Sequence, residues 1–271
     1  MSQTTKKDAI GFPPPLLGEA PLRLSLIGEG SGWIALNKPS GIGMREHPWD
    51  IGVPHLDGAL NRQLQSGKPE LLAKQAELFG SVYYLDPGIA GVALFATTRA
   101  ALAEWRNHFG GGGLRFRFRF VSADDSGPDT RECDAPLLPH RSKPRMVPST
   151  AKGKKTRTAF QRLASSESGW SLWEGVAEHL RPHQLRVHAA LAGIPVLGDA
   201  AYQGPVAPLL RELMPGKRSS GLRLPVFRGP AIYLREVAVV KEGLEGPDAV
   251  TAPADKEMTT LLKRMGWSEV W

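Results

Sequence analysis

The residue whose type and setting could do chemistry most directly is Asp86, in the tripeptide Asp86-Pro87-Gly88. Apolar runs at residues 82–85 and 89–96 flank it, and both are rich in residues that favour β structure. Pro and Gly favour a tight turn between them. We therefore expect a strand, a turn and a strand, with one carboxylate at the rim of a buried sheet. A carboxylate there could act as a nucleophile or a base, whereas the simpler interpretation is that Asp-Pro-Gly is only a turn.

A second group of polar side chains lies about a hundred residues downstream, in residues 180–204 (LRPHQLRVHAALAGIPVLGDAAYQG). It begins with basic residues, continues as a predicted helix with Arg186 and His188 near its start, and ends in a Gly-Asp turn at Asp199. Read from the residues alone, Asp199 could serve only as a helix cap and Arg186 only as a surface residue.

The sequence gives little support for a metal centre or a disulfide. Three histidines lie close together along the chain: His179, His183 and His188. No carboxylate stands at ligand spacing from them and no fourth ligand motif follows, so we expect no metal. The single cysteine, Cys133, has no intrachain disulfide partner, which suits a reducing cytoplasm.

Charge indicates the class of partner. The chain of 271 residues has a formal net charge of +7 and a pI near 9.6. Its basic residues gather at 115–119, 141–162 and 181–188. The charge suggests a polyanionic partner, with nucleic acid the first candidate, and a solvated basic surface is the alternative interpretation. No apolar run reaches the roughly 20 residues that span a bilayer, and no secretory signal is evident, so we expect no membrane partner.

The elements that must position these residues alternate along the chain. We expect strands within residues 22–41, 81–98, 114–121, 159–163, 170–176 and 222–240. Helical spacing of apolar residues predicts helices at 56–64, 69–78, 99–108, 184–192 and 256–271. Residues 1–20 predict a flexible leader, and residues 250–271 a C-terminal helical region.

Two segments combine structural and binding signals. Residues 114–121 (LRFRFRFV) alternate Arg and Phe with period two, which predicts a strand with one apolar and one basic face. Its arginines are either solvated or in contact with a phosphate backbone. Residues 141–158 are too basic and Pro-rich for a core, so we expect a hairpin or loop that reaches towards RNA or DNA. Four glycines at 110–113 would allow close backbone approach to a ligand.

Several motifs, in order over residues 22–204, resemble the RluA-type RNA pseudouridine synthases. The family's hallmarks are His-Arg-Leu-Asp-x-x-Thr-Ser-Gly around the nucleophile and, downstream, Gly-Arg-(Thr/Lys)-His-Gln-Ile-Arg-Val-His. The matching residues here are Asn37-Lys38-Pro39-Ser40-Gly41, Leu85-Asp86, Arg145-Met146-Val147, Gly153-Lys154, Thr158, His183-Gln184-Leu185-Arg186-Val187-His188 and Gly198-Asp199-x-x-Tyr202-x-Gly204. The resemblance implies an α+β fold: an extended mixed, mostly antiparallel sheet in two halves with a central active-site cleft, formed by a catalytic domain at residues 21–249.

The chain also departs from the family pattern. Tyr83-Tyr84 replace His-Arg, and Ile89-Ala90-Gly91 replace Thr-Ser-Gly. Downstream, Leu180 and Pro182 stand in the places of Gly and Thr. The family's base-packing tyrosine falls at Phe118 or, one register away, at Arg117. We expect no small RNA-binding domain ahead of the catalytic domain.

The resemblance implies the chemistry and the site. Asp86 would be the nucleophile or base that acts on the target uridine, and Arg186 would pair with it and keep it ionised. No metal and no organic cofactor would be needed. Substrate-binding residues would be Tyr84, Phe118, Arg117, Arg181, His183, Gln184, Arg145 and Lys154, with Lys143 and Lys155 beside the RNA backbone. The partner would be rRNA or tRNA, and we expect a cytoplasmic monomer.

Two other interpretations stay open at this point. The altered residues around Asp86 would fit a catalytically impaired RNA-binding protein that keeps the synthase fold. An unrelated metabolic enzyme on an α+β scaffold would require the ordered motifs to be a coincidence.

Overall fold

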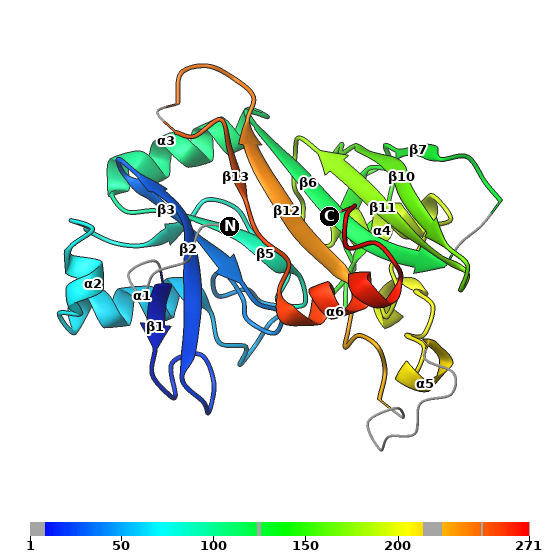
Figure 1. Ribbon diagram of the computed structural model, residues 1–271. Helices are drawn as coiled ribbons and strands as arrows, with labels where there is room; N and C mark the ends of the chain where they lie inside the picture. Colours follow the sequence, from blue (N-terminus) through cyan, green and yellow to red (C-terminus); the bar gives the residue numbers. More distant parts are fainter. Residues whose placement is uncertain (1–8, 124–125, 214–223, 245, 271) are drawn as a thin grey trace. The chain divides into compact units, whose positions relative to one another are not determined.

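The computed structural model describes residues 9–123, 126–213, 224–244 and 246–270 (Figure 1). The chain forms two compact units. Unit 1 comprises Met1–Phe116, Glu178–Pro182 and Leu234–Pro253, and unit 2 comprises Arg117–Ala177, His183–Tyr233 and Ala254–Trp271. Two strands, β6 (Leu114–Ala123) and β12 (Ile232–Val239), contribute residues to both units.

Unit 1 is built on antiparallel strands in the order β1 (Ala9–Phe12), β2 (Leu22–Gly30), β3 (Trp33–Lys38) and β5 (Ala90–Ala96). The short β4 (Gly80–Ser81) pairs with β5, and β13 (Ala249–Thr251) pairs with β12. Every residue of β5 is buried, which explains its unbroken apolar sequence. The register places Lys38 of β3 opposite Gly91 of β5, so the segment after β3 meets the segment before β5.

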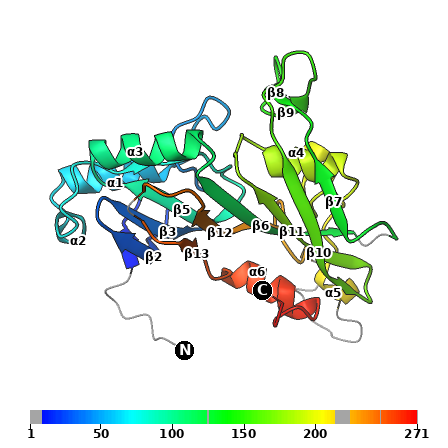
Figure 2. The same ribbon diagram turned by 90° about the horizontal axis from the view of Figure 1, so that it is seen from above.

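Within the described residues of unit 1 the helices are α1 (Leu56–Gln65), α2 (Pro69–Leu72) and α3 (Arg99–Gly110). Figure 2 shows α1 and α3 on one face of the strands β3 and β5. Each begins at a side-chain cap: His55 accepts the Gly58 N–H for α1, and Thr98 accepts the Ala101 N–H for α3. The predicted helices at 56–64 and 99–108 are confirmed.

Three expectations in unit 1 were wrong. Residues 82–85 form no strand: only Gly80–Ser81 pairs with β5, although residues 82–85 are buried. The apolar pattern predicted the burial of these residues correctly but not their backbone pairing. A short, continuous apolar run shows no alternation that would distinguish a strand from another buried segment. The helix expected at 69–78 ends at Leu72. Residues 9–12 of the expected leader form β1, with Ile10 and Phe12 buried; residues 1–8 lie outside the described residues.

Unit 2 holds strands in the order β6, β11 (Trp170–Ala177), β10 (Thr158–Ser166) and β7 (Thr130–Cys133). A separate two-stranded sheet, β8 (Leu137–Pro139) and β9 (Met146–Pro148), forms a hairpin that projects from the other strands (Figure 2). The helices are α4 (Gln184–Leu191), the 3-10 helix η1 (Ala200–Tyr202), α5 (Leu210–Leu213) and α6 (Lys256–Arg264). The predicted strands at 159–163 and 170–176, the basic hairpin and the helix at 184–192 are confirmed.

Strand β6 shows the predicted alternation. Phe116, Phe118 and Phe120 are buried, while the arginines between them are partly exposed. The mostly antiparallel strands with helices packed on them confirm the α+β class. Of the strand region expected at 222–240, β12 is present, and residues 222–223 lie outside the described residues.

Candidate active site

Asp86 lies in unit 1 on a tight turn just before β5. The N–H of Ile89 donates to the carbonyl of Asp86 at 3.0 Å, which closes the turn around Pro87 and Gly88. Asp86 is 4% exposed. The predicted turn is confirmed, and it holds a carboxylate that is nearly enclosed by protein.

The Asn-Lys-Pro-x-Gly segment, residues 37–41, holds this turn by donating hydrogen bonds to the turn's backbone carbonyls. The ammonium of Lys38 donates to the carbonyls of Ile42 at 2.6 Å and Pro87 at 3.2 Å. The N–H of Gly41 donates to the Pro87 carbonyl at 2.8 Å, and the hydroxyl of Ser40 to the Gly88 carbonyl at 3.1 Å. Two motifs that are distant in sequence therefore form one structural feature.

Lys38 also brings charge to the turn. It is 1% exposed, and burial lowers its pKa to about 7, while the negative charges of Asp86 and Asp50 oppose that shift. The sequence motif indicated that Lys38 belongs to the family pattern. It did not indicate that the ammonium would bond the turn that holds Asp86.

Gly91 explains why one residue of the family's Thr-Ser-Gly remains in this chain. Its φ is +123°, and a Cβ atom there would lie 2.1 Å from the carbonyl oxygen of Leu234. No side chain fits that contact. The hydroxyls of Thr and Ser are absent from this chain, but the glycine that lets β5 approach β12 is present.

The two tyrosines at the family's His-Arg positions make different contacts. Tyr83 is buried, donates its hydroxyl to the Val92 carbonyl at 2.7 Å and packs against Phe109 and Phe116. Tyr84 donates to the Asp50 carboxylate at 2.5 Å, and its ring lies 4.4 Å from that of His47. His47 and Asp50 were missed by the sequence reasoning, because residues 44–54 carry no periodic or motif signal.

A further buried carboxylate, Asp57, ties α1 to β4. It accepts the backbone N–H and the hydroxyl of Ser81 at 3.0 and 3.1 Å. Burial raises the pKa of Asp57 to about 6, despite those hydrogen bonds and the nearby charges of Arg45 and Arg106. Its polar partners lie within unit 1, and nothing in the sequence distinguished it from an ordinary residue of a helical first turn.

In unit 2 the side chains of the downstream motif, residues 183–204, contact one another. Arg186 forms a bidentate pair with Asp199, at 2.7 Å from both Nε and Nη2. The guanidinium also lies over the Tyr202 ring at 5.2 Å, and His183 Nδ1 lies 2.9 Å from the Tyr202 hydroxyl. Asp199 in addition caps η1 by accepting the Ala201 N–H. The helix-cap interpretation of Asp199 is confirmed, but the surface interpretation of Arg186 was wrong, since its side chain is 11% exposed.

The remaining polar residues of this motif support the strand that precedes it. Gln184 Nε2 donates to the Arg157 carbonyl at 3.1 Å and lies 3.2 Å from the Thr158 hydroxyl. His188 lies 2.9 Å from the Thr158 hydroxyl and 3.0 Å from that of Thr156, and burial lowers the pKa of His188. Gln184, predicted to bind substrate, is 1% exposed and makes these structural contacts.

The basic hairpin is anchored at its base and exposed along its length. The N–H of Met146 donates to the Tyr202 hydroxyl at 2.9 Å, so the downstream motif also holds β9. Arg145 is half-buried, and its Nε has no hydrogen-bond partner in the described part of the protein. The exposed cations of this hairpin and the segment that follows it are Arg141, Lys143, Lys152, Lys154 and Lys155.

The candidates on β6 are less available to a ligand. Arg117 pairs with Glu174 at 2.5 Å, and the same carboxylate lies 3.7 Å from Arg119. The two arginines are thus paired with Glu174, so the interpretation that they are merely solvated was wrong. Their contact with a phosphate backbone stays a prediction. Phe118, predicted to stack on the base, is 1% exposed in unit 2.

The four-glycine segment serves packing. A Cβ at Gly112 would lie 2.8 Å from the His179 ring, and one at Gly113 would lie 2.3 Å from the His108 ring. Gly112 and Gly113 therefore leave room for histidine rings, and the close approach of a ligand to this segment stays a prediction. Arg181, also predicted to bind substrate, is half-buried at the end of the unit 1 segment Glu178–Pro182.

The predicted site residues fall into two groups. Asp86, Tyr84 and Arg181 belong to unit 1, and the others belong to unit 2: Arg117, Phe118, Arg145, Lys154, His183, Gln184 and Arg186. In the residues that the structure describes, no three His, Cys, Asp or Glu side chains form a group that could hold a metal ion. Across the same residues, no helix has the length and apolar character needed to cross a membrane.

Comparison with known proteins adds the family. No family model matches the chain. The dual-specificity RNA pseudouridine synthase RluA of Escherichia coli O157:H7 is 30% identical over 187 residues, covering 64% of this chain and 74% of the relative. The RluA of strain K12 is 29% identical over 182 residues, with the same coverage. The chain belongs to the RluA-type RNA pseudouridine synthases.

A more distant member of the family is the chloroplastic RNA pseudouridine synthase 2 of rice, 27% identical over 172 residues, which cover 61% of this chain and 38% of that protein. The fold agrees with human RNA pseudouridylate synthase domain containing 4, with a TM-score of 0.66, 17% identity and coverage of 89% and 92% of the two chains. As an RluA-type synthase this chain is an isomerase. The predictions of family, fold class and enzyme class are confirmed.

Proposed function

We propose that this synthase isomerises uridine to pseudouridine in rRNA or tRNA in the cytoplasm, with Asp86 as the nucleophile. The observation that carries the proposal is the turn around Asp86. It holds a nearly enclosed carboxylate, and the family's Asn-Lys-Pro-x-Gly segment binds the backbone on its C-terminal side. The RluA relatives, which are described as dual-specificity, support an RNA substrate.

The reaction breaks the bond between uracil nitrogen 1 and ribose carbon 1, turns the base and joins carbon 5 to the ribose. The hydrogen of carbon 5 leaves as a proton, and a proton returns to nitrogen 1, so no other reactant is consumed. Asp86 would act as the nucleophile or base in this sequence. The apolar residues Leu85 and Ile89, both buried, would limit the access of water and strengthen electrostatic interactions around the carboxylate.

An ionised carboxylate in such a setting needs a nearby cation. Lys38 supplies one within unit 1 in its protonated form, which with a pKa of about 7 is partly populated at neutral pH. The predicted pair between Asp86 and Arg186 would join the two units, and it stays a prediction. A guanidinium has five N–H donors and can serve two carboxylates, so its pair with Asp199 is compatible with this role and fixes its orientation.

The target uridine must leave the RNA stack before it can react, at a cost of a few kcal/mol. The hairpin's exposed cations, among them Lys143, Lys154 and Lys155, would recover part of that cost by binding phosphates. Arg181 would bind the displaced nucleotide or its phosphate. Affinity carried by these residues should fall steeply as salt rises.

The test is release of tritium from total RNA labelled at uracil carbon 5. We expect release by the natural protein, by the matched control Asp248→Asn, whose carboxylate is exposed in unit 1, and none by Asp86→Asn. Equal release by Asp86→Asn would remove Asp86 from the mechanism. RNA binding without any release would favour the non-catalytic alternative.

A further inference from the structure

Tyr84 occupies the position of the family's arginine, yet its side chain is directed into the protein. It is 6% exposed. Its hydroxyl donates to Asp50 Oδ2 at 2.5 Å, a short bond to a charged acceptor. Tyr84 therefore holds the segment 44–54 in a fixed position, and its own ring is largely covered.

The ring that covers Tyr84 belongs to His47. The two ring centroids lie 4.4 Å apart with an interplanar angle of 34°, and the Trp49 ring meets the His47 ring edge-on at a centroid distance of 5.2 Å. The backbone N–H of Trp49 donates to His47 Nδ1 at 3.3 Å. When Nδ1 accepts, the proton of a neutral imidazole is on Nε2, so His47 presents an N–H donor there.

His47 keeps this neutral form at pH 7. Burial lowers its pKa, and Arg45 lowers it further, while Asp50 and Asp86 oppose the shift. The side chains of His47 and Asp50 are 19% and 16% exposed, so the cluster is partly open to solvent. His47 and Asp50 line a groove of about 700 Å³, together with Glu46, His55 and Arg62.

The cluster lies close to the nucleophile. Tyr84 precedes Asp86 by two positions, and the carboxylates of Asp50 and Asp86 both act on the buried ammonium of Lys38. A neutral donor and an indole are suited to a uridine nucleotide, because uracil carbonyls accept hydrogen bonds and any base can stack on an aromatic ring.

From these contacts we propose that Tyr84 is a positioning residue that fixes the segment 44–54 beside Asp86, so that His47 Nε2–H and the Trp49 ring contact the nucleotide being modified. The inference rests on the proposed function. It replaces the stacking role that the sequence suggested for Tyr84, because the His47 ring covers the Tyr84 ring. The groups proposed to contact the nucleotide belong to residues 44–54, which carry no family motif.

The first experiment measures single-turnover tritium release at saturating labelled RNA. Tyr84→Phe removes only the hydroxyl, and His47→Ala only the imidazole, and we expect each to slow release by roughly tenfold with little change in RNA affinity. His47→Gln keeps an N–H donor and should recover most of the rate. Tyr83→Phe is the matched control, since its hydroxyl bonds the Val92 carbonyl outside the cluster, and it should release at the natural rate.

The second experiment needs no catalysis. Oligouridylate that carries 4-thiouridine is cross-linked to the protein by light, and the adducts are mapped by mass spectrometry. We expect an adduct at His47 or Trp49 that is reduced at least severalfold in Tyr84→Phe. Adducts found only outside residues 44–54, or natural release rates in the His47→Ala and Tyr84→Phe variants, would overturn the proposal. If the natural protein released no tritium, the proposed function would fail, and the cross-linking would decide the nucleotide contact independently.

Discussion

The two parts of the predicted active site are held by different kinds of contact. In unit 1, side chains of the Asn-Lys-Pro-x-Gly segment bind backbone: Lys38 and Ser40 donate to the carbonyls of Pro87 and Gly88. The polar groups of that segment shape a turn, and Asp86 stands on it.

In unit 2, the downstream motif is held by contacts between its own side chains. Arg186 pairs with Asp199, and His183 meets Tyr202. These residues lock a helix start to a turn, so any catalytic role is added to a structural one. A family motif therefore does not assign one kind of role: substitution of Asp86 in unit 1 should separate activity from stability, and substitution of Arg186 in unit 2 should reduce both.

The largest effect should come from Asp86→Asn. We expect at least a thousandfold loss of the single-turnover rate, roughly 4 kcal/mol in the activation barrier, because an amide is a poor nucleophile and base. The turn is held through backbone atoms, so the free energy of unfolding in urea should stay within about 1 kcal/mol of the natural value. A large loss of stability would show that the carboxylate supports the turn itself.

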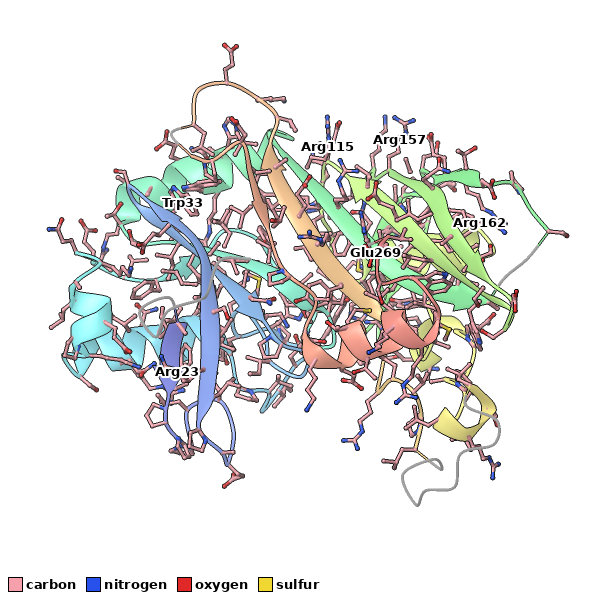
Figure 3. All side chains as sticks on the ribbon, viewed as in Figure 1. Arg23, Trp33, Arg115, Arg157, Arg162 and Glu269 are labelled. Carbon is pink, nitrogen blue, oxygen red and sulfur yellow. The ribbon has the colours of Figure 1, made fainter. Side chains whose placement is uncertain are left out.

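Arg186→Met should reduce stability and activity together. It leaves Asp199, 1% exposed, without the guanidinium, and breaking one partner of a buried pair costs about 3–5 kcal/mol. The matched control is Arg157→Met, which removes a similar bidentate pair with Glu132 at the exposed edge of unit 2, where Figure 3 labels Arg157. Urea unfolding should show little or no loss for this control. Equal losses in the two variants would contradict the difference between buried and exposed pairs.

Gly91→Ala should destabilise unit 1 by roughly 2–4 kcal/mol, because the added Cβ would meet the Leu234 carbonyl at a positive φ. Gly110→Ala is the control, since a Cβ there meets nothing within 4 Å and its φ is ordinary. Thermal unfolding of both variants measures the difference. A Gly91→Ala variant as stable as Gly110→Ala would mean that β5 and β12 can move apart without cost.

The smallest effect should be the pH dependence of Asp57→Asn. The folded state raises the pKa of Asp57 from 3.8 to about 6, so the folded protein binds more protons than the unfolded chain between these values. The stability contributed by Asp57 is full below pH 3.8 and is lost as the pH rises through about 6. Asparagine does not ionise, so the variant should gain roughly 2 kcal/mol on the natural protein between pH 4 and pH 7.5.

Urea unfolding at several pH values measures that gain. Ser165→Ala, a hydroxyl deletion in β10 of unit 2 that removes no titrating group, provides a reference whose difference from the natural protein should not vary over the same range. A constant difference for Asp57→Asn would show that hydrogen bonds from Ser81 and the charges of Arg45 and Arg106 fully offset the effect of burial.

Sequence reasoning succeeded where a local pattern had a single physical meaning. The alternation of Arg and Phe in residues 114–121 predicted β6, and helical spacing predicted α1, α3 and α4. It failed where the pattern reported burial alone. Residues 82–85 are buried without pairing as a strand. Residues 9–12 pair with β2, although they show no periodic pattern that would predict a strand.

By itself the sequence determined the resemblance to the family, because motifs are local properties, and the resemblance implied the α+β class and the nucleophile candidate. Only the tertiary structure decided which partner each motif residue has. Register between β3 and β5 brings Lys38 to the Asp86 turn, and helix α4 brings Arg186 to Asp199. The cluster of His47, Asp50 and Tyr84 also depends on tertiary packing, because contacts between side chains join its members. The spacing of these residues along the chain does not predict the cluster.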